Sequence, residues 1–238
     1  MMIDGGLPTG QFTDVIESHT DLVDVVKFGW GTSVVTAGLR DKVDACTANG
    51  VDYYFGGTLF EKFLVQDQLD DWRRFIDSFG VGTIEISNGT IDLSNERKAE
   101  YVARFAGDYR VFSEVGLKDS AKSAEMDADE WLRYIREDLA AGAVKVITEA
   151  RESGTSGIAG ANGELRGNII DDILASDIDV DQLMFEAPTK ALQIYFIDRV
   201  GTNVNLGNIA STDLVPLETL RLGLRGDTLM TMEERTNA

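Results

Sequence analysis

Short strand-like runs alternate with helix-like segments along all 238 residues, and this alternation predicts an α/β protein with parallel strands. Two further observations favour a (βα)8 TIM barrel. The strand-like runs number eight, and each is followed after a short connection by a helical segment. The length of the chain also matches the usual size of such a barrel, about 250 residues.

The expected strands are short runs rich in β-branched and aromatic residues. The sixth, AVKVIT at 143–148, shows the pattern well, because its β-branched residues suit a buried strand and charged residues follow at once, beginning with Glu149. Charges that directly follow a buried strand lie at one edge of the sheet. The eight expected strands cover residues 1–4, 22–28, 51–55, 82–87, 109–115, 143–148, 182–188 and 202–208.

Apolar residues at helical spacing fill the intervals between these strands. Ser94 and Asp127 are expected N-caps, and Gly50 and Gly142 are expected to end the helices that precede them. The tail from Arg225 to residue 238 has no strong pattern and is expected to be irregular. Helices are expected at residues 9–20, 34–49, 58–66, 70–79, 94–106, 127–141, 165–175, 190–199 and 213–223.

A doubly wound open sheet is the competing architecture. Such a sheet usually carries a Gly-x-Gly-x-x-Gly turn after its first strand, whereas the turn here reads GGLPTG at 5–10. The chain has only three prolines, and no Pro-rich linker divides it. We therefore expect residues 1–238 to form a single barrel domain.

The composition argues against several kinds of partner and site. With 41 acidic and 22 basic residues the net charge is −19, which repels nucleic acid and anionic membranes. A lysine-poor acidic surface also keeps proteins of high-salt cells hydrated, so we expect a halophilic archaeon as the source; the alternative is an ordinary acidic cytosolic protein. The single cysteine, Cys46, rules out a disulfide framework and a thiolate metal site, and the lone His19 is expected to be a solvated surface residue. The sequence shows no signal peptide and no apolar run of about 18 residues, the length that a membrane-spanning helix needs. We therefore expect a soluble, cytoplasmic protein.

Polar side chains gather at the expected strand ends, which in a barrel surround one mouth. Half of them are carboxylates and none is histidine or cysteine, and oxygen ligands alone suit Mg²⁺. Lysines and an arginine beside carboxylates suit an anionic substrate. Each residue taken singly is explained equally well as a solvated charge, but it is much less expected that all of them are incidental. The set comprises Asp4, Lys27, Glu85, Glu114, Lys118, Glu149, Arg151, Glu186, Asn203 and Asn205.

The segment NVNLGNI at 203–209 is the best candidate for a phosphate site. Barrels often hold a phosphate near their last two strands through backbone N–H groups. Gly207 allows close approach of the backbone, and Asn203, Asn205 and Asn208 supply neutral donors. An ordinary Asn/Gly turn explains the segment equally well.

Several longer motifs occur in order along the chain: KFGWGTS (27–33), GGTLFE (56–61), EISNGTI (85–91), SEVGLKD (113–119), EARESGTSGI (149–158), FEAP (185–188), NVNLGNI (203–209) and LETLRLGLRGDT (217–228). Over essentially the whole chain they resemble the phosphosulfolactate synthase family. The resemblance implies a (βα)8 barrel that uses Mg²⁺. It also implies the addition of sulfite to phosphoenolpyruvate to form (2R)-2-phospho-3-sulfolactate, a step of coenzyme M biosynthesis.

The same resemblance implies roles for individual residues. Lys118 in SEVGLKD matches the expected general acid, which protonates C2 after sulfite has attacked C3. Arg151 and Lys27 are expected to hold sulfite or phosphate, and the four glutamates at the mouth are expected to bind the metal or to orient a lysine. We assign Lys118, Arg151 and Glu114 to catalysis, Lys27, Asn203, Asn205, Gly207 and Asn208 to substrate binding, and Glu85, Glu149 and Glu186 to Mg²⁺.

Two departures from the family pattern leave alternatives open. The family reads Asp-Lys-Gly after the first strand and tends to have two lysines after SEVG, whereas this chain reads Asp4-Gly5-Gly6 and Leu117-Lys118. The loss of two cations from an anion-binding mouth would weaken binding or indicate another substrate. The alternatives are a related barrel acting on another small anionic acid and a non-catalytic, stress-related binding protein. Association into homo-oligomers and missing upstream sequence also stay open.

Overall fold

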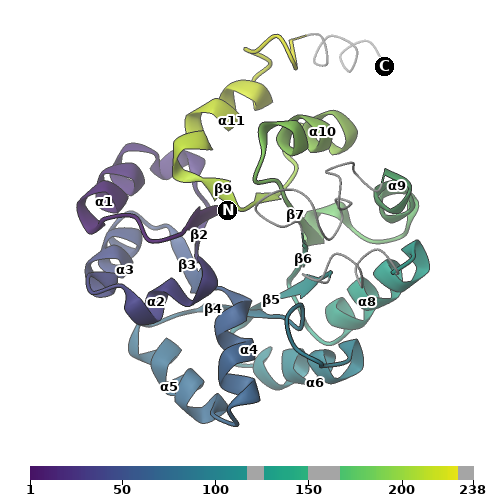
Figure 1. The fold of residues 1–238 in the computed structure, drawn as a ribbon. Helices are drawn as coiled ribbons and strands as arrows, with labels where there is room; N and C mark the ends of the chain where they lie inside the picture. The colour runs from purple at the N-terminus through teal and green to yellow at the C-terminus, as the bar shows by residue number, and fades with distance from the viewer. Residues whose placement is uncertain (117–125, 150–166, 230–238) are drawn as a thin grey trace.

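The structure is a computed structural model in which residues 1–116, 126–149 and 167–229 are described. Figure 1 looks along the axis of a ring of strands, around which the helices form an outer layer. Every strand pair is parallel, and a helical segment lies between each strand and the next from β1 to β8. The structure therefore confirms the predicted parallel α/β fold.

The strands form two parallel sheets, ordered β3-β2-β1-β9 and β4-β5-β6-β7-β8. Asn208 alone separates β8 from β9, so one short stretch of chain pairs with β7 on one side and with β1 on the other. The strand bounds are β1 Met2–Asp4, β2 Val25–Phe28, β3 Asp52–Phe55, β4 Thr83–Ile86, β5 Arg110–Val115, β6 Lys145–Thr148, β7 Leu183–Glu186, β8 Leu206–Gly207 and β9 Ile209–Ala210.

The junction between β3 and β4 differs from the others. Both strands are fully described and lie in contact, but no ladder of main-chain hydrogen bonds joins them. Side chains cross the junction instead: the Thr83 hydroxyl donates to the Asp52 carboxylate at 2.6 Å, and Arg110 pairs with the same carboxylate at 3.0 Å. Asp52 therefore ties the two sheets together at this junction.

The helices surround the ring of strands (Figure 1). Ser94 and Asp127 accept hydrogen bonds from the N–H groups of Arg97 and Glu130, which confirms both predicted N-caps. The helix bounds are α1 Thr9–Ser18, α2 Thr32–Val35, α3 Leu39–Ala48, α4 Gly57–Val65, α5 Leu69–Ser78, α6 Asn95–Phe105, α8 Ala128–Ala140, α9 Gly167–Ala175, α10 Lys190–Val200 and α11 Leu214–Arg221.

Two predicted elements differ in the structure. The helix predicted over 34–49 is divided, because the extended backbone of Thr36 separates α2 from α3. The strand predicted over 202–208 begins only at Leu206, and Asn208 interrupts it with a φ of 55°. In the predicted irregular tail, residues 225–229 lie in no helix or strand, and residues 230–238 fall outside the described part of the chain.

The strands are buried on both faces because the interior of the ring covers one face and the helices cover the other. No residue of β2, β4 or β7 is exposed. Between neighbouring helices, the rings of Phe60 on α4 and Phe105 on α6 pack edge-on against Trp72 on α5, with centroid distances of 5.4 and 5.2 Å. Among the described helices, none is long and apolar enough to cross a membrane.

Candidate active site

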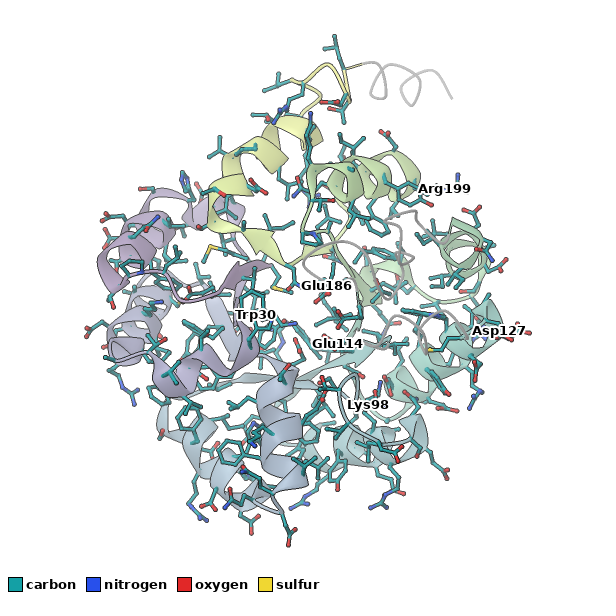
Figure 2. All side chains as sticks on the ribbon, in the orientation of Figure 1. Trp30, Lys98, Glu114, Asp127, Glu186 and Arg199 are labelled. Atoms are coloured by element: carbon teal, nitrogen blue, oxygen red, sulfur yellow. The ribbon has the colours of Figure 1, made fainter. Side chains whose placement is uncertain are left out.

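One lysine and three glutamates meet at the carboxyl ends of the strands. Lys27 Nζ on β2 lies 3.0 Å from Glu85 Oε2 on β4 and 3.4 Å from Glu186 Oε1 on β7. It also lies 3.6 Å from Glu114 Oε2 on β5. Lys27 is 7% exposed and each glutamate 1%, and Figure 2 shows Glu114 and Glu186 near the axis of the ring. Four of the residues predicted at the mouth therefore form one buried cluster, the Lys27 cluster.

Side-chain alternation along the strands explains why these polar groups point into the ring. Lys27 is in register with Tyr54 on β3, and residues in register on neighbouring parallel strands share a face. Burial and the charge of Glu85 raise the pKa of the Tyr54 hydroxyl well above its ordinary value. Tyr54 therefore keeps its proton beside the Lys27 cluster at neutral pH.

Glu85 is held on both oxygens by groups of this chain. Its Oε1 accepts a hydrogen bond from the N–H of Gly57 at 2.6 Å, and its Oε2 faces Lys27. Gly57 is the first residue of α4, where N–H groups are unsatisfied and the helix dipole favours an anion. A Cβ on Gly57 would lie 2.7 Å from Glu85 Oε1, so glycine is required for this close approach.

Lys27 is a fixed cation at neutral pH. Burial lowers its pKa, but the electrostatic interactions with Glu85, Tyr54, Glu186 and Glu114 outweigh burial and raise the pKa well above the ordinary lysine value. The ammonium group can therefore hold the neighbouring carboxylates in place. It cannot readily release a proton near neutrality.

Glu149 follows β6 directly and is 3% exposed. Its N–H donates to the Val115 carbonyl at 2.9 Å, which aligns the ends of β5 and β6. Gly116 packs over it with a φ of +126°, and a Cβ there would lie 2.7 Å from Glu149 Cβ and 2.9 Å from Trp131 Cη2. Glu149 is therefore closely packed at the carboxyl end of the ring.

Asp4, at the end of β1, is part of a separate buried ion pair. Its Oδ2 accepts from Lys42 Nζ at 2.6 Å, and its Oδ1 accepts from the N–H groups of Gly6 and Leu7 at 2.9 and 2.8 Å. These contacts fix the turn after β1. The interactions of Asp4 are thus explained by its own loop and by Lys42 on α3.

Gly5, where the family pattern has lysine, lies beneath Trp30. A Cβ on Gly5 would come within 2.6 Å of Trp30 Cζ3. Trp30 is 48% exposed, has a φ of 50°, and lies close to the axis of the ring in Figure 2. In this chain an indole ring therefore covers the place from which a side chain at position 5 would start.

The predicted phosphate segment is divided between the two ends of the ring. Gly207 pairs with Glu186 at the carboxyl end, and Asn208 follows it, so both lie where they were predicted. Asn205 instead donates from Nδ2 to the carbonyls of Asp181 and Leu183, which precede and begin β7, at 3.2 and 3.0 Å. The predicted carboxyl-end location is therefore wrong for Asn205 and for Asn203 before it, because the strand starts later than expected.

Two predicted catalytic residues, Lys118 and Arg151, lie outside the described residues. Buried Cys46 is no substitute as a reactive group, because burial raises the pKa of its thiol to about 12. The part of the candidate site that can be described thus consists of the Lys27 cluster together with Glu149 and Gly207.

The sequence model of the (2R)-phospho-3-sulfolactate synthase (ComA) family matches residues 1–227. The chain belongs to the phosphosulfolactate synthase family. Phosphosulfolactate synthase of Bacillus subtilis (strain 168) is 50% identical over 228 residues, which is 96% of this chain and 90% of the relative. The enzyme of the same name from Methanothermobacter thermautotrophicus is 39% identical over 233 residues, with 96% and 90% covered.

Solved structures of other enzymes share the fold of this phosphosulfolactate synthase family member. A 3-hexulose-6-phosphate synthase of Salmonella typhimurium superimposes with a TM-score of 0.56 at 12% identity, covering 97% of this chain and 98% of that one. A second structure of a 3-hexulose-6-phosphate synthase gives a TM-score of 0.54 at 13% identity, with 99% and 97% covered. At such identities the likeness concerns the fold alone.

Several buried polar residues of this family member were missed by sequence reasoning. Lys42 on α3, Lys98 on α6 and Asp138 on α8 are each 0% exposed, and Glu61 on α4 is 1% exposed. A signal was present for Lys98, which precedes Val102 by four residues and so belongs to the apolar face of its helix. A charged residue at such a position indicates a buried partner.

The carboxylates at the mouth have the donor chemistry that suits Mg²⁺, namely oxygen without nitrogen or sulfur. Within the described ranges, no group of three or more acidic, histidine or cysteine side chains has an arrangement that would hold a metal ion. Mg²⁺ commonly binds one or two carboxylates and completes its coordination with water and substrate oxygens. A site of that kind fits these residues, whereas an all-protein cage does not.

Proposed function

We propose that this chain is a phosphosulfolactate synthase that adds sulfite to phosphoenolpyruvate with the help of Mg²⁺, giving (2R)-2-phospho-3-sulfolactate. One observation supports this above all others: a chain of this family buries Lys27 among three glutamates at the carboxyl end of its strands. In parallel ring folds this end carries the reacting groups.

The bond changes explain which charges the reaction needs. The sulfur of sulfite forms a bond to C3, the electron pair of the C2–C3 double bond moves toward C2 and the carboxylate, and a proton is then added at C2. Two anions have to approach each other while negative charge grows on the substrate. Fixed positive charges favour both events.

Lys27 carries a fixed charge, but Glu85, Glu114 and Glu186 hold its ammonium group in place and more than offset its charge. The net positive charge that the two anions need therefore has to come from other groups at the mouth. Because its pKa is raised, Lys27 stays protonated and is a poor proton donor. A different residue has to protonate C2. We assign that step to Lys118 on the family resemblance, with Arg151 as a second cation for sulfite or phosphate and Gly207 and Asn208 as the backbone site nearest the phosphate.

For Mg²⁺ we propose Glu85, Glu149 and Glu186 as the candidate ligands; Glu85 also contacts Gly57 and Lys27, and Glu186 also contacts Lys27. When bound, Mg²⁺ supplies electrostatic stabilisation for the charge that develops on the substrate carboxylate. Since phosphoenolpyruvate is an intracellular metabolite, we also assign the protein to the cytoplasm.

One observation favours a second candidate, the same type of addition on another small anionic acid. Gly5 brings no positive charge to the mouth, and Trp30 lies over it. A less cationic, partly aromatic mouth suits a substrate with less charge than phosphoenolpyruvate.

The test is sulfite-dependent consumption of phosphoenolpyruvate by the purified protein, with Mg²⁺ and with a chelator, at low and high salt. Product is identified by ³¹P NMR and mass spectrometry. We expect phosphosulfolactate with Mg²⁺, loss of turnover with the chelator, and normal turnover in Lys190→Met, which changes an exposed lysine paired with Asp227. A folded protein without turnover at either salt concentration overturns the assignment, and product from another acid supports the second candidate.

A further inference from the structure

A buried ion pair lies directly behind the Lys27 cluster. Lys98 on α6 and Asp138 on α8 are each 0% exposed, and Lys98 Nζ lies 2.7 Å from Asp138 Oδ2. The same ammonium group donates to the main-chain carbonyl of Glu114 at 2.7 Å. Lys98 therefore connects two outer helices to the strand residue whose side chain faces Lys27.

The neighbouring contacts show that this pair is hydrogen-bonded to β5 on the side of the strand that faces the helices. Asp138 accepts hydrogen bonds from the Ser113 hydroxyl and from Asn95 Nδ2, the latter at 3.4 Å. Ser113 precedes Glu114, so its side chain points toward the helices while that of Glu114 points into the ring. Two adjacent residues of β5 are thus hydrogen-bonded to the helices, Ser113 through its hydroxyl and Glu114 through its carbonyl.

The hydrogen bond from Lys98 is made near the end of β5. β4 is in register with β5 only as far as the Ile86–Ser113 pair, so Glu114 lies one residue beyond the last pair with β4. Lys98 supplies its hydrogen bond at that residue, and Figure 2 shows its side chain between α6 and the strand that carries Glu114. The helices therefore support the end of β5 where its pairing with β4 has stopped.

Stability alone is a weak reason for a charged pair at this place. Removing both ions from water is costly, and apolar replacements of such pairs are often equally stable or more so. A neutral group does a similar task at the end of β7, where Gln193 on α10 donates to the Ala187 carbonyl at 3.2 Å. The charged pair at β5 instead joins α6, α8 and β5 at a single ammonium group.

We propose that Lys98 and Asp138 are positioning residues that fix the end of β5 so that the Glu114 carboxylate stays against Lys27. Both residues act on β5 from its outer side, Lys98 through the main-chain carbonyl of Glu114 and Asp138 through the hydroxyl of Ser113. Loss of the pair lets the end of β5 shift, and Glu114 then holds Lys27 less well. The kinetic effect expected from this shift rests on the proposed function, whereas its structural effect does not.

The experiment uses the full-length protein and removes the pair without leaving a buried charge. Lys98→Met, Asp138→Leu and Ser113→Ala are combined, since the serine would otherwise lose its acceptor. Val102→Ala on the same helix is the matched control, because it removes a fully buried side chain and leaves the Lys98 contacts intact. Thermal unfolding, kcat and KM for phosphoenolpyruvate are measured together with hydrogen exchange of the peptide 110–116.

We expect the triple variant to stay folded, with kcat reduced on the order of 10–100-fold and KM nearly unchanged, because the loss is one of alignment. Exchange at 110–116 is expected to quicken in this variant and not in Val102→Ala. Wild-type kcat in the triple variant overturns the positioning role, as does an equal loss of kcat in Val102→Ala. If the wild-type protein itself shows no turnover, the proposed function fails and the positioning role is tested by hydrogen exchange alone. Unchanged exchange at 110–116 in the triple variant then overturns the positioning role.

Discussion

Replacing Lys27 by methionine tests whether its ammonium group holds the mouth together. The change keeps a long side chain but removes the positive charge shared by Glu85, Glu114 and Glu186, which lie 3.0–3.6 Å from Nζ. All three carboxylates are nearly inaccessible to water. Removing one partner from a buried ion pair costs about 3–5 kcal/mol.

This free energy converts into a measurable shift of the melting temperature. For a chain of this size each kcal/mol lowers Tm by about 2–4 °C, so we expect Lys27→Met to melt about 6–20 °C below the wild type at neutral pH. Lys190→Met is the control, because its lysine is 46% exposed and such pairs contribute at most about 1 kcal/mol. Differential scanning calorimetry of both variants decides the point.

The pH dependence gives an independent check with a definite sign. The pKa of Lys27 is raised in the folded protein, so its contribution to stability is complete below the ordinary lysine value of 10.5 and is lost as pH rises through the folded value. On the alkaline side of neutrality, the gap in stability between wild type and Lys27→Met should therefore stay constant at first and narrow in strong alkali. A Tm equal to that of Lys190→Met at neutral pH would refute the reasoning.

Three further predictions concern residues near the mouth. Gly116→Ala should cost at least about 2 kcal/mol in urea unfolding, since it combines a positive φ with a Cβ too close to Glu149; a cost below about 0.5 kcal/mol contradicts this. Gly5→Ala should destabilise the wild type by about 1 kcal/mol but not the Trp30→Ala variant, and equal effects in both backgrounds would show that the indole is not the obstacle. Lys118→Ala should abolish turnover while calorimetry still detects phosphoenolpyruvate binding, and unchanged turnover would remove Lys118 from the mechanism.

Features governed by local chemistry were predicted well from the sequence. Ser94 and Asp127 cap their helices through hydrogen bonds to residues three positions later, so the whole signal lies in a few neighbouring letters. Glu85 and Glu114 were found because each stands near the end of an apolar run. In a parallel ring, that position alone places a side chain near the others.

Features that depend on tertiary pairing were not predictable in the same way. Lys98 and Asp138 are 40 positions apart on different helices, and their contact depends on how the two helices are rotated against β5. The alternation in NVNL resembles a strand, but the chain pairs only from Leu206 onward, and Asn205 turns its amide to the start of β7. The sequence pattern carries no information on where a strand meets its neighbour.

The junction between β3 and β4 has a consequence for how the ring opens. Elsewhere an opening has to break a row of main-chain hydrogen bonds, whereas here it has to break the contacts of Asp52 with Thr83 and Arg110. Local unfolding follows the route with the smallest free energy. Local opening of the ring should therefore begin at this junction. The amides of 52–55 and 83–86 should exchange before those of 145–148, because β6 is paired with a strand on each side. Asp52→Asn, which weakens the crossing, should quicken that early exchange and leave the rest of the ring as it was.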